Sequence, residues 1–128
     1  MSDIQPELWV EHPSEAIAFY QAAFGAVVAH RVGDGEDIVA QLAVRNARFW
    51  IANADPENQR FNPTAIGGGT SRTLLIVDDP DAVVQAASTA GATITSPVSD
   101  EHGWRLGRIT APCGHRWEIG KPTGPWPP

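Results

Sequence analysis

The segment LWVEHPSEAIAFYQAAFGAVV, residues 8–28, decides the fold, because a close copy of it returns as LIVDDPDAVVQAASTAGATI, residues 75–94. Leu8 matches Leu75 and Pro13 matches Pro80, with the same offset along the chain in both pairs. An internal repeat of this kind indicates two copies of one supersecondary unit. The two copies can therefore be compared position by position.

Each copy is typical of a strand, a helix and three further strands. In the first copy Pro13 opens the helix and Gly25 ends it, as a proline in the first turn and a glycine at the C-terminal cap commonly do. In the second copy Asp79 and Pro80 open the helix and Gly91 ends it. Period-two patterns and turn residues predict the strands. The expected strands are residues 7–10, 26–31, 38–44 and 47–51 in the first unit and residues 72–77, 92–95, 104–110 and 116–119 in the second.

The length of 128 residues and the 42% of hydrophobic residues suit a single α+β domain, residues 1–128. We expect two βαβββ units at about residues 5–53 and 71–120, joined by a linker at 54–70. The linker is longer than most connections, and such loops are often functional or mobile. A proline-rich tail at 121–128 is not expected to form helix or inner strand, because proline lacks a backbone donor.

The net charge of −6 opposes binding to a phosphate backbone, so no nucleic-acid partner is expected. No apolar run approaches the ~20 residues of a membrane helix, and no membrane partner is expected. The first residues, MSDIQPELWVEH, lack the layout of a signal peptide, and the lone Cys113 allows no intrachain disulfide. These features predict a cytoplasmic protein.

Two motifs within the repeat resemble a known family. AIAFYQAAFGA at residues 16–26 and GRITAPCGHRWEIG at residues 107–120 resemble the vicinal oxygen chelate superfamily, although Ala111 stands where an Asp is usual. That superfamily includes glyoxalase I, extradiol dioxygenases, fosfomycin-resistance enzymes and bleomycin-resistance binding proteins. The resemblance covers about residues 5–120. It implies a cupped mixed sheet with the helices on its outer face, and a homodimer with two equivalent cups, often shared between subunits.

In the metal-using members of the superfamily, each unit supplies two ligands, one from its first strand and one from its last. The resemblance places Glu118 at the last-strand position of the second unit, and the offset of the repeat then gives Ile51 in the first unit. The first-strand positions fall at Gln5 and Arg72. Only Glu118 suits a divalent metal, and Arg72 would oppose one. We therefore expect no metal and no other cofactor.

Arg72 and Glu118 are interpreted either as a structural ion pair across the cup or as a polar anchor for a ligand. The spacing of the four histidines fits no metal motif. His12 is expected to cap a helix and His115 to be structural, whereas His30 and His102 could face a ligand, although a surface or turn role is favoured for each. Cys113 is interpreted as a turn residue of APCGH rather than a nucleophile.

Strand alternation divides the remaining residues between two faces. If the four ligand positions point into the cup, residues two positions away do so as well, Asn53 among them. Residues of the opposite parity would then face the helices: Leu8, Val10, Trp50, Leu75, Val77, Trp117 and Ile119. The predicted ligand-binding residues are Glu7, Trp9, Phe49, Ile51, Arg72, Leu74, Ile76, Trp104, Leu106, Arg116 and Glu118.

Five tryptophans in this chain are a high number. Aromatic faces stack flat ligands, and tryptophan is also enriched in subunit interfaces, so both roles stay open for Trp9 and Phe49. Trp126 lies in the tail, where a packed or a free side chain is favoured.

The sequence favours a metal-free binding protein of the bleomycin-resistance kind, which sequesters a flat, largely aromatic small molecule such as an antibiotic. No catalytic set is visible, which suits binding without turnover. The first alternative is a glyoxalase-like enzyme that uses Glu118 as a general base, or that binds metal through atypical ligands such as His30 or Glu7. The second alternative is a structural or interaction domain without a small ligand.

Overall fold

The two sequence copies form two βαβββ units in the computed structural model, which describes residues 1–125. In the first unit, helix α1 begins after His12, with Pro13 in its first turn, and Gly25 ends it in the left-handed conformation at φ 68°. The elements of this unit are β1 (Glu7–Val10), α1 (Pro13–Phe24), β2 (Val27–Asp34), β3 (Asp37–Val44) and β4 (Ala47–Asn53).

The second unit repeats this order after the linker. The carboxylate of Asp79 caps helix α3 by accepting a hydrogen bond from the backbone N–H of Ala82 over 3.1 Å. The elements are β5 (Thr73–Ile76), α3 (Pro80–Thr89), β6 (Thr93–Glu101), β7 (Trp104–Thr110) and β8 (Arg116–Pro122). The prediction of tandem βαβββ units in an α+β fold is therefore confirmed.

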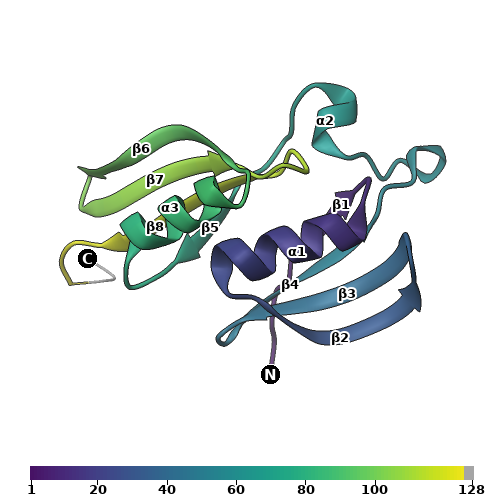
Figure 1. Cartoon of the computed structure of the whole chain (residues 1–128). Coiled ribbons are helices and arrows are strands. Elements are labelled where there is room, and N and C mark those ends of the chain that lie inside the picture. Colours follow the sequence, from purple (N-terminus) through teal and green to yellow (C-terminus); the bar gives the residue numbers. More distant parts are fainter. Residues whose placement is uncertain (126–128) are drawn as a thin grey trace.

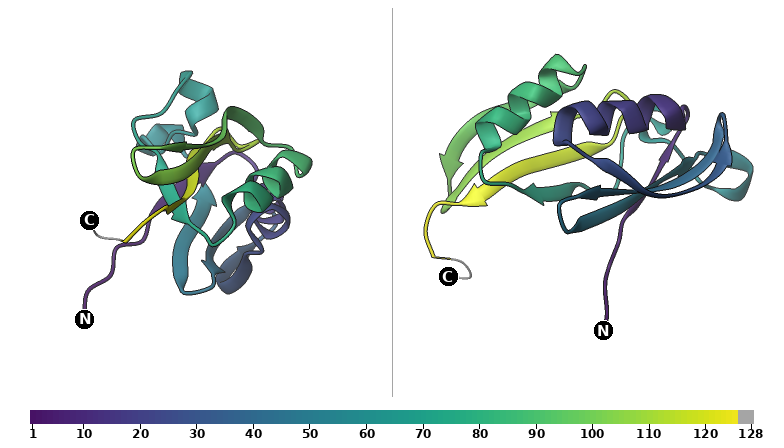
Figure 2. Two further views of the ribbon diagram at one scale, coloured as in Figure 1. Left: turned by 90° about the vertical axis from the view of Figure 1, so that its left-hand side faces the viewer. Right: turned by 60° about the horizontal axis from the view of Figure 1, so that its bottom comes forward.

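Each unit builds its own mixed sheet of four strands, in the orders β1-β4-β3-β2 and β5-β8-β7-β6. In each sheet the first strand runs parallel to the last, and the other neighbours are antiparallel. Helices α1 and α3 pack against each other and lie on the same side of the two sheets (Figures 1 and 2). The side of each sheet that faces away from α1 and α3 is called the open face of that unit.

Trp117 of β8 joins the two units through the buried core. Its ring lies 4.9 Å from that of Phe24 and 5.3 Å from that of Phe49, measured between centroids, and both partners belong to the first unit. Its indole N–H donates to the hydroxyl of Tyr20 over 3.0 Å, which satisfies two polar groups that would otherwise be buried alone. The helix side of the molecule is thus one continuous apolar core.

The linker and the last strand depart in detail from expectation. The linker contains a short 3-10 helix, η1 (Pro56–Asn58), and a single helical turn, α2 (Pro63–Ile66). Strand β8 continues to Pro122, because β5 ends opposite Gly120 and leaves β8 as an edge beyond that point, where proline is tolerated. Trp126 lies outside the described residues. No helix in the part of the chain that the structure describes is long and apolar enough to cross a membrane.

Candidate functional site

Gln5 is the centre of a hydrogen-bonded group on the open face of the first unit. Its side-chain oxygen accepts from the indole N–H of Trp50 over 2.8 Å and from the amide of Gln41 over 2.8 Å. The ring of His30, from the edge strand β2, lies 6.2 Å from that of Trp50 in an edge-on arrangement. Arg48 extends this group by donating to the side-chain oxygen of Gln41 over 3.2 Å. The first unit therefore presents a polar group beside an aromatic ring.

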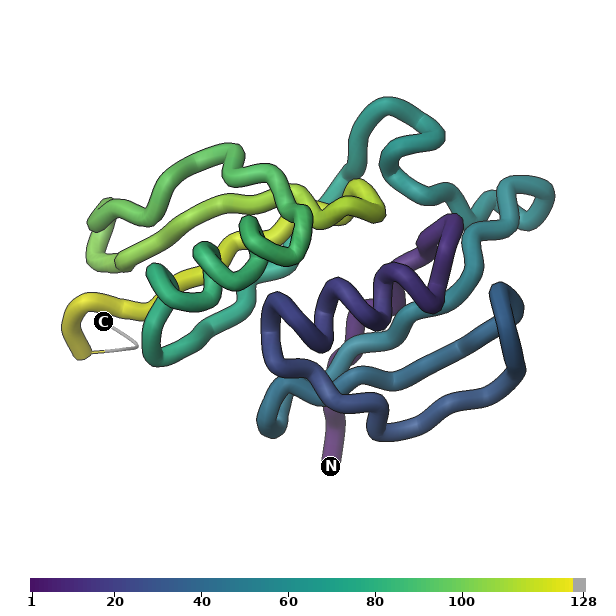
Figure 3. Tube along the Cα trace, in the orientation of Figure 1, coloured from purple at the N-terminus to yellow at the C-terminus, as the bar shows by residue number. Residues whose placement is uncertain are grey.

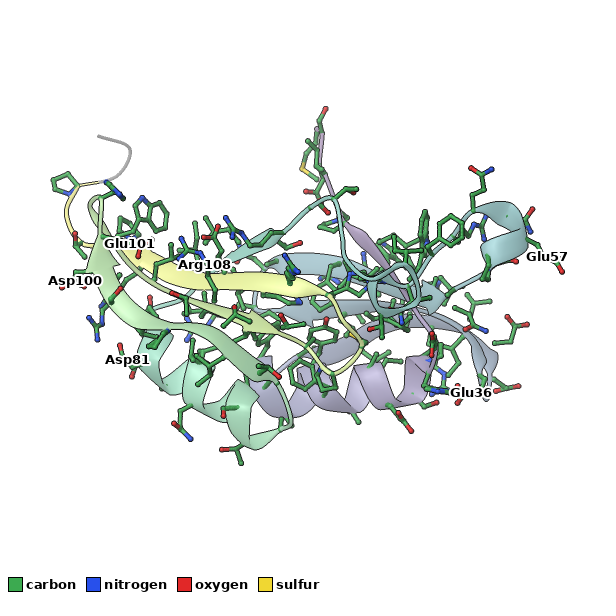
Figure 4. The ribbon with its side chains drawn as sticks, turned by 90° about the horizontal axis from the view of Figure 1, so that it is seen from above. Glu36, Glu57, Asp81, Asp100, Glu101 and Arg108 are labelled. Atoms are coloured by element: carbon green, nitrogen blue, oxygen red, sulfur yellow. The ribbon has the colours of Figure 1, made fainter. Side chains whose placement is uncertain are left out.

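Glu118 is the centre of a charged group on the open face of the second unit. One of its carboxylate oxygens lies 3.3 Å from Nε of Arg72, and the other accepts from Nε of Arg108 over 3.0 Å. Arg108 also binds Glu101 over 2.8 Å, and the hydrogen bonds with these two carboxylates raise the pKa of its guanidinium. Figure 4 shows Arg108 and Glu101 on the side of the sheet that faces away from the helices.

The two groups are equivalent by structure. Glu7 pairs with Trp50 across β1 and β4, and Leu74 pairs with Glu118 across β5 and β8. Trp50 is therefore the counterpart of Glu118, with an offset one position longer than that between Leu8 and Leu75. The extra residue lies in the turn before the last strand. Two residues separate Val44 from Ala47 in the first unit, whereas three residues separate Ala111 from His115 in the second.

The prediction that Phe49 and Ile51 line the cup was wrong, and so was the placement of Trp50 in the core. Phe49 is 5% exposed and Ile51 is fully buried on the helix side. The ring of Phe49 packs edge-on against that of Tyr20 at 5.1 Å. A shift of one residue moves every side chain of a strand to the other face. The single added residue in the turn therefore reversed the assignment for the whole of β4.

The other predicted residues lie on the open faces. The alternation of burial and the strand register place Trp9 and Glu7 in the first unit, where the indole of Trp9 donates to the carboxylate of Glu7 over 2.8 Å. In the second unit Leu74 and Ile76 are 42% and 54% exposed. Register with β8 puts the following residues on the same face: Trp104, Leu106, Arg108 and Arg116. Gln41 and Arg108 were not predicted, although they match each other at the same offset as Leu8 and Leu75, so the repeat itself could have paired them.

The histidines have separate roles. Nδ1 of His12 lies 3.4 Å from a carboxylate oxygen of Glu36. The expectation that His12 caps α1 was wrong, because its side chain makes no capping hydrogen bond. His102 sits in the tight turn between β6 and β7 at φ 51°. Nε2 of His115 lies 2.8 Å from the backbone oxygen of Trp9, which connects the β7–β8 turn with β1. Burial lowers the pKa of His115, and the contact with the oxygen of Trp9 raises it by a smaller amount. The net lowering of the pKa favours the neutral ring.

The two groups occupy the four positions at which metal-using members of the superfamily hold their metal. The residues of this chain at those positions do not suit a metal site. Gln5, Trp50, Arg72 and Glu118 offer a single carboxylate, and the side chain of Trp50 carries no metal ligand. Arg72 places a positive charge beside that carboxylate. Among residues 1–125 no group of three or more His, Cys, Asp or Glu side chains could hold a metal ion.

Comparisons with known proteins agree with this architecture. The model of the Glyoxalase/Bleomycin resistance protein/Dioxygenase superfamily matches residues 4–119. The chain therefore belongs to this superfamily, as the resemblance predicted. An uncharacterized protein of Mycobacterium bovis is 35% identical over 125 residues, which cover 93% of this chain and 82% of that protein.

Two solved structures illustrate the range of the fold. TnmS3, an antibiotic binding protein from Streptomyces, is 22% identical with a TM-score of 0.70, covering 95% of this chain and 97% of its own. A glyoxalase-related enzyme from Fulvimarina pelagi is 17% identical with a TM-score of 0.71, covering 94% and 88%. At these identities the likeness establishes the fold alone, and the same scaffold hosts both binding and catalysis.

Proposed function

We propose that this protein is a binding protein that sequesters a flat, largely aromatic small molecule, such as an antibiotic, between open sheet faces. One observation carries the proposal. At the positions of the metal site the chain has a hydrogen-bonded Gln5–Trp50 pair and an ion-paired Arg72–Glu118 group, and the exposed apolar side chains of Leu74 and Ile76 share the face of the second group. Clefts that combine apolar walls with a few placed polar groups are typical of small-molecule sites.

The apolar walls come from both units. Leu74 and Ile76 are exposed in the second unit, and Val32 and Val39 are exposed on the paired strands β2 and β3 of the first. Half-buried Trp9 and Trp50 add aromatic surface beside them. Aromatic rings favour stacked or edge-on contacts with other rings, each worth ~0.5–1.5 kcal/mol beyond area burial. This composition suits a planar ligand with few charges.

Two copies of the chain would complete each cup in this proposal. Both helices lie on one side of the two sheets, so neither open face of one chain covers the other (Figure 4). Exposed apolar side chains that cluster on one face mark interaction surfaces. The open face of the first unit would oppose that of the second unit from a partner copy. Light scattering at micromolar concentration should give about twice the mass of one chain, and the mass of a single chain would contradict the shared cup.

The catalytic alternative rests on Glu118 as a general base. Both carboxylate oxygens of Glu118 already contact arginine, one with Arg72 and the other with Arg108, so a substrate proton donor would compete with these contacts. The two atypical ligands considered for a metal are also engaged in other contacts. Glu7 accepts from the indole of Trp9, and His30 packs against Trp50. These contacts favour a binding role for the open faces.

The proposal is tested by calorimetric titration of the purified protein with an acridine, an anthraquinone and a flavone. At least one of them is expected to bind saturably and to be recovered unchanged. Trp9→Ala should weaken that binding several-fold or more, through lost stacking and ~25 cal/mol per Å² of lost apolar contact. The matched control is Gln85→Ala, an exposed position on α3 that should leave the affinity unchanged.

Two outcomes would contradict the proposal. The first is that no planar compound binds while the protein is folded. The second is conversion of the bound compound at a rate that depends on Glu118, which would favour the enzyme.

A further inference from the structure

A cavity lies on the helix side of the molecule, away from both open faces. It has a volume of about 130 Å³ and lies between the start of α1, the linker turn α2 and the turn between β7 and β8. Figure 3 shows the linker running beside that turn at the N-terminal end of α1. The lining residues that carry the argument are Glu11, Glu15, Phe19, Asn62, Thr64 and Cys113.

Close contact between the linker and the β7–β8 turn fixes the cavity. Gly114 has a φ of 96°, and a side chain at this position would collide with the side chain of Thr64. A glycine is therefore required both by the backbone conformation and by the close approach of α2. Because Asn62 immediately precedes α2, this contact also holds Asn62 over the cavity.

Asn62 is a buried polar side chain whose oxygen is left unsatisfied. It is 3% exposed, and its side-chain oxygen has no hydrogen bond within the described part of the chain. An asparagine before a helix normally accepts from the first turn of that helix, but Asn62 makes no such cap. A buried acceptor without a donor is costly, and native structures rarely leave one. Asn62 lines this cavity, so a donor bound there would satisfy it.

The charges around the cavity define the kind of donor. Glu11 and Glu15 are exposed carboxylates in its lining. His12 also lines the cavity, and its Nδ1 lies 3.4 Å from the carboxylate of Glu36. Burial raises the pKa of the Cys113 thiol, so the sulfur stays neutral and adds no charge. The described residues hold no cluster of three metal-ligating side chains, which favours an organic cation over a metal ion.

The remaining walls are apolar. Phe19 and Ala16 are buried side chains of α1 that line the cavity, together with Pro112 from the β7–β8 turn. A cavity of similar size, ~150 Å³, accepts a ring of six carbon atoms. This cavity therefore has room for a short alkyl chain beside the polar groups.

We propose that this cavity binds the ammonium end of a small primary amine, with Asn62 and the two glutamates accepting hydrogen bonds from its N–H groups and Phe19 contacting its alkyl chain. This site is separate from the open faces, so its success or failure is independent of the proposed sequestering function.

The test is a titration of the uniformly ¹⁵N-labelled full chain with n-propylammonium chloride, followed by NMR. Propionate and 1-propanol are matched probes of similar size and different charge. Only propylammonium is expected to shift the side-chain amide of Asn62 and the backbone amides of Glu11, Thr64 and Gly114 saturably. A dissociation constant on the order of millimolar is expected for a ligand of this size.

Variants separate the amine site from a general surface effect. Asn62→Ala and the double variant Glu11→Gln/Glu15→Gln should each weaken propylammonium binding several-fold, whereas Asn62→Asp should strengthen it through an added charge. Glu57→Gln is the control, because Glu57 is an exposed carboxylate on η1 outside the cavity (Figure 4).

Three results would overturn the proposal. The first is the absence of a saturable shift at the side-chain amide of Asn62. Cross-peaks from its amide protons to water alone would count as the same result. The second is equal binding of propionate or 1-propanol. The third is an Asn62→Asp variant that stays folded, as its backbone spectrum would show, but binds propylammonium more weakly than the natural chain.

Discussion

Trp50 and Glu118 occupy the same place in the two units, although the offset between them is one position longer than in the strand–helix part of the repeat. Each lies on an open face and contacts a residue just before the first strand of its unit. Trp50 donates to Gln5 over 2.8 Å, and Glu118 lies 3.3 Å from Arg72. One unit thus has an amide as its central acceptor and the other a carboxylate, and these two different polar groups stand at the positions of the metal site.

The two tryptophans of the last strands should respond differently to the same substitution. Trp117→Phe should lower the free energy of unfolding by ~1–3 kcal/mol, because it removes buried contacts and the hydrogen bond to Tyr20. Trp50→Phe, on the half-buried open face, should cost less stability but weaken ligand binding. Urea unfolding monitored by circular dichroism measures the first effect. A larger loss for Trp50→Phe than for Trp117→Phe would contradict the assigned faces.

The repeat allowed most of the fold to be predicted from sequence. Matched pairs such as Leu8 with Leu75 and Pro13 with Pro80 identified both strand–helix segments, and the alternation in β5 and β8 correctly separated Leu74 from Leu75 and Glu118 from Trp117. The prediction failed in β4, which was assigned by its offset from the last strand of the second unit. The turn between residues 111 and 115 has one residue more than its counterpart, and the matched strand–helix segments do not include this turn, so the extra residue could not be located.

The cavity beside Asn62 and the contact of His115 depend on long-range contacts that no local sequence pattern reveals. Asn62 reads as an ordinary loop residue, yet it is 3% exposed in the segment of the linker that approaches Gly114. The contact of His115 with the backbone of Trp9 likewise joins a turn and a strand that lie far apart in the sequence. Long-range packing of this kind is set by the whole fold rather than by the residues beside it.

Within the charged group on the second open face, Arg108 should contribute more than Arg72 to the free energy of unfolding. The side chain of Arg108 is 29% exposed, against 46% for Arg72, so water screens Arg72 more strongly. Glu118→Ala should lower the free energy of unfolding by ~1–2 kcal/mol, since it leaves Arg108 without one of its two carboxylates. Arg108→Met should cost more than Arg72→Met in the same urea experiment. The reverse order would mean that the pair with Arg72 is the structural one.

An exposed cluster on the other side of the second unit serves as the control for this group. Arg105 binds Asp81 through two hydrogen bonds of 2.7 and 2.8 Å, which lower the pKa of Asp81. Asp81 lies on α3 at the surface (Figure 4), where solvent weakens such pairs. Asp81→Asn should therefore change the unfolding free energy less than Glu118→Ala does.

Stability should depend on pH through His115. Burial lowers the pKa of this ring below its ordinary value of 6.5, so the unfolded chain binds the proton more readily than the folded chain. The contribution of the neutral His115 ring to the free energy of unfolding is complete above pH 6.5. It declines as the pH falls from 6.5 towards the lowered pKa of the folded state. Each unit of separation between the two pKa values is worth about 1.4 kcal/mol.

His115→Gln tests this dependence, because its amide can still donate to the oxygen of Trp9 but does not titrate. The variant should lose less stability than the natural chain between pH 7 and pH 5.5. Identical pH profiles for the two proteins would show that His115 does not contribute.

The purified protein should contain no stoichiometric divalent metal. The four positions of the family's metal seat provide one carboxylate, which two arginines already contact. Elemental analysis after expression in metal-supplemented medium should find well below one zinc, nickel, manganese or iron per chain. About one metal per chain that disappears in Glu118→Ala would show that the seat binds a cation despite Arg72.

The central claim is that a planar ligand lies against the open faces, and the indole N–H resonances of the tryptophans test it most directly. The tightest binder among the acridine, the anthraquinone and the flavone is titrated into the ¹⁵N-labelled chain, with each indole assigned by substitution. We predict saturable shifts for Trp9, Trp50 and Trp104, and an unchanged resonance for Trp117, which lies in the core with its N–H on Tyr20. Shifts confined to Trp117, or none at the three open-face tryptophans despite saturating ligand, would contradict the account.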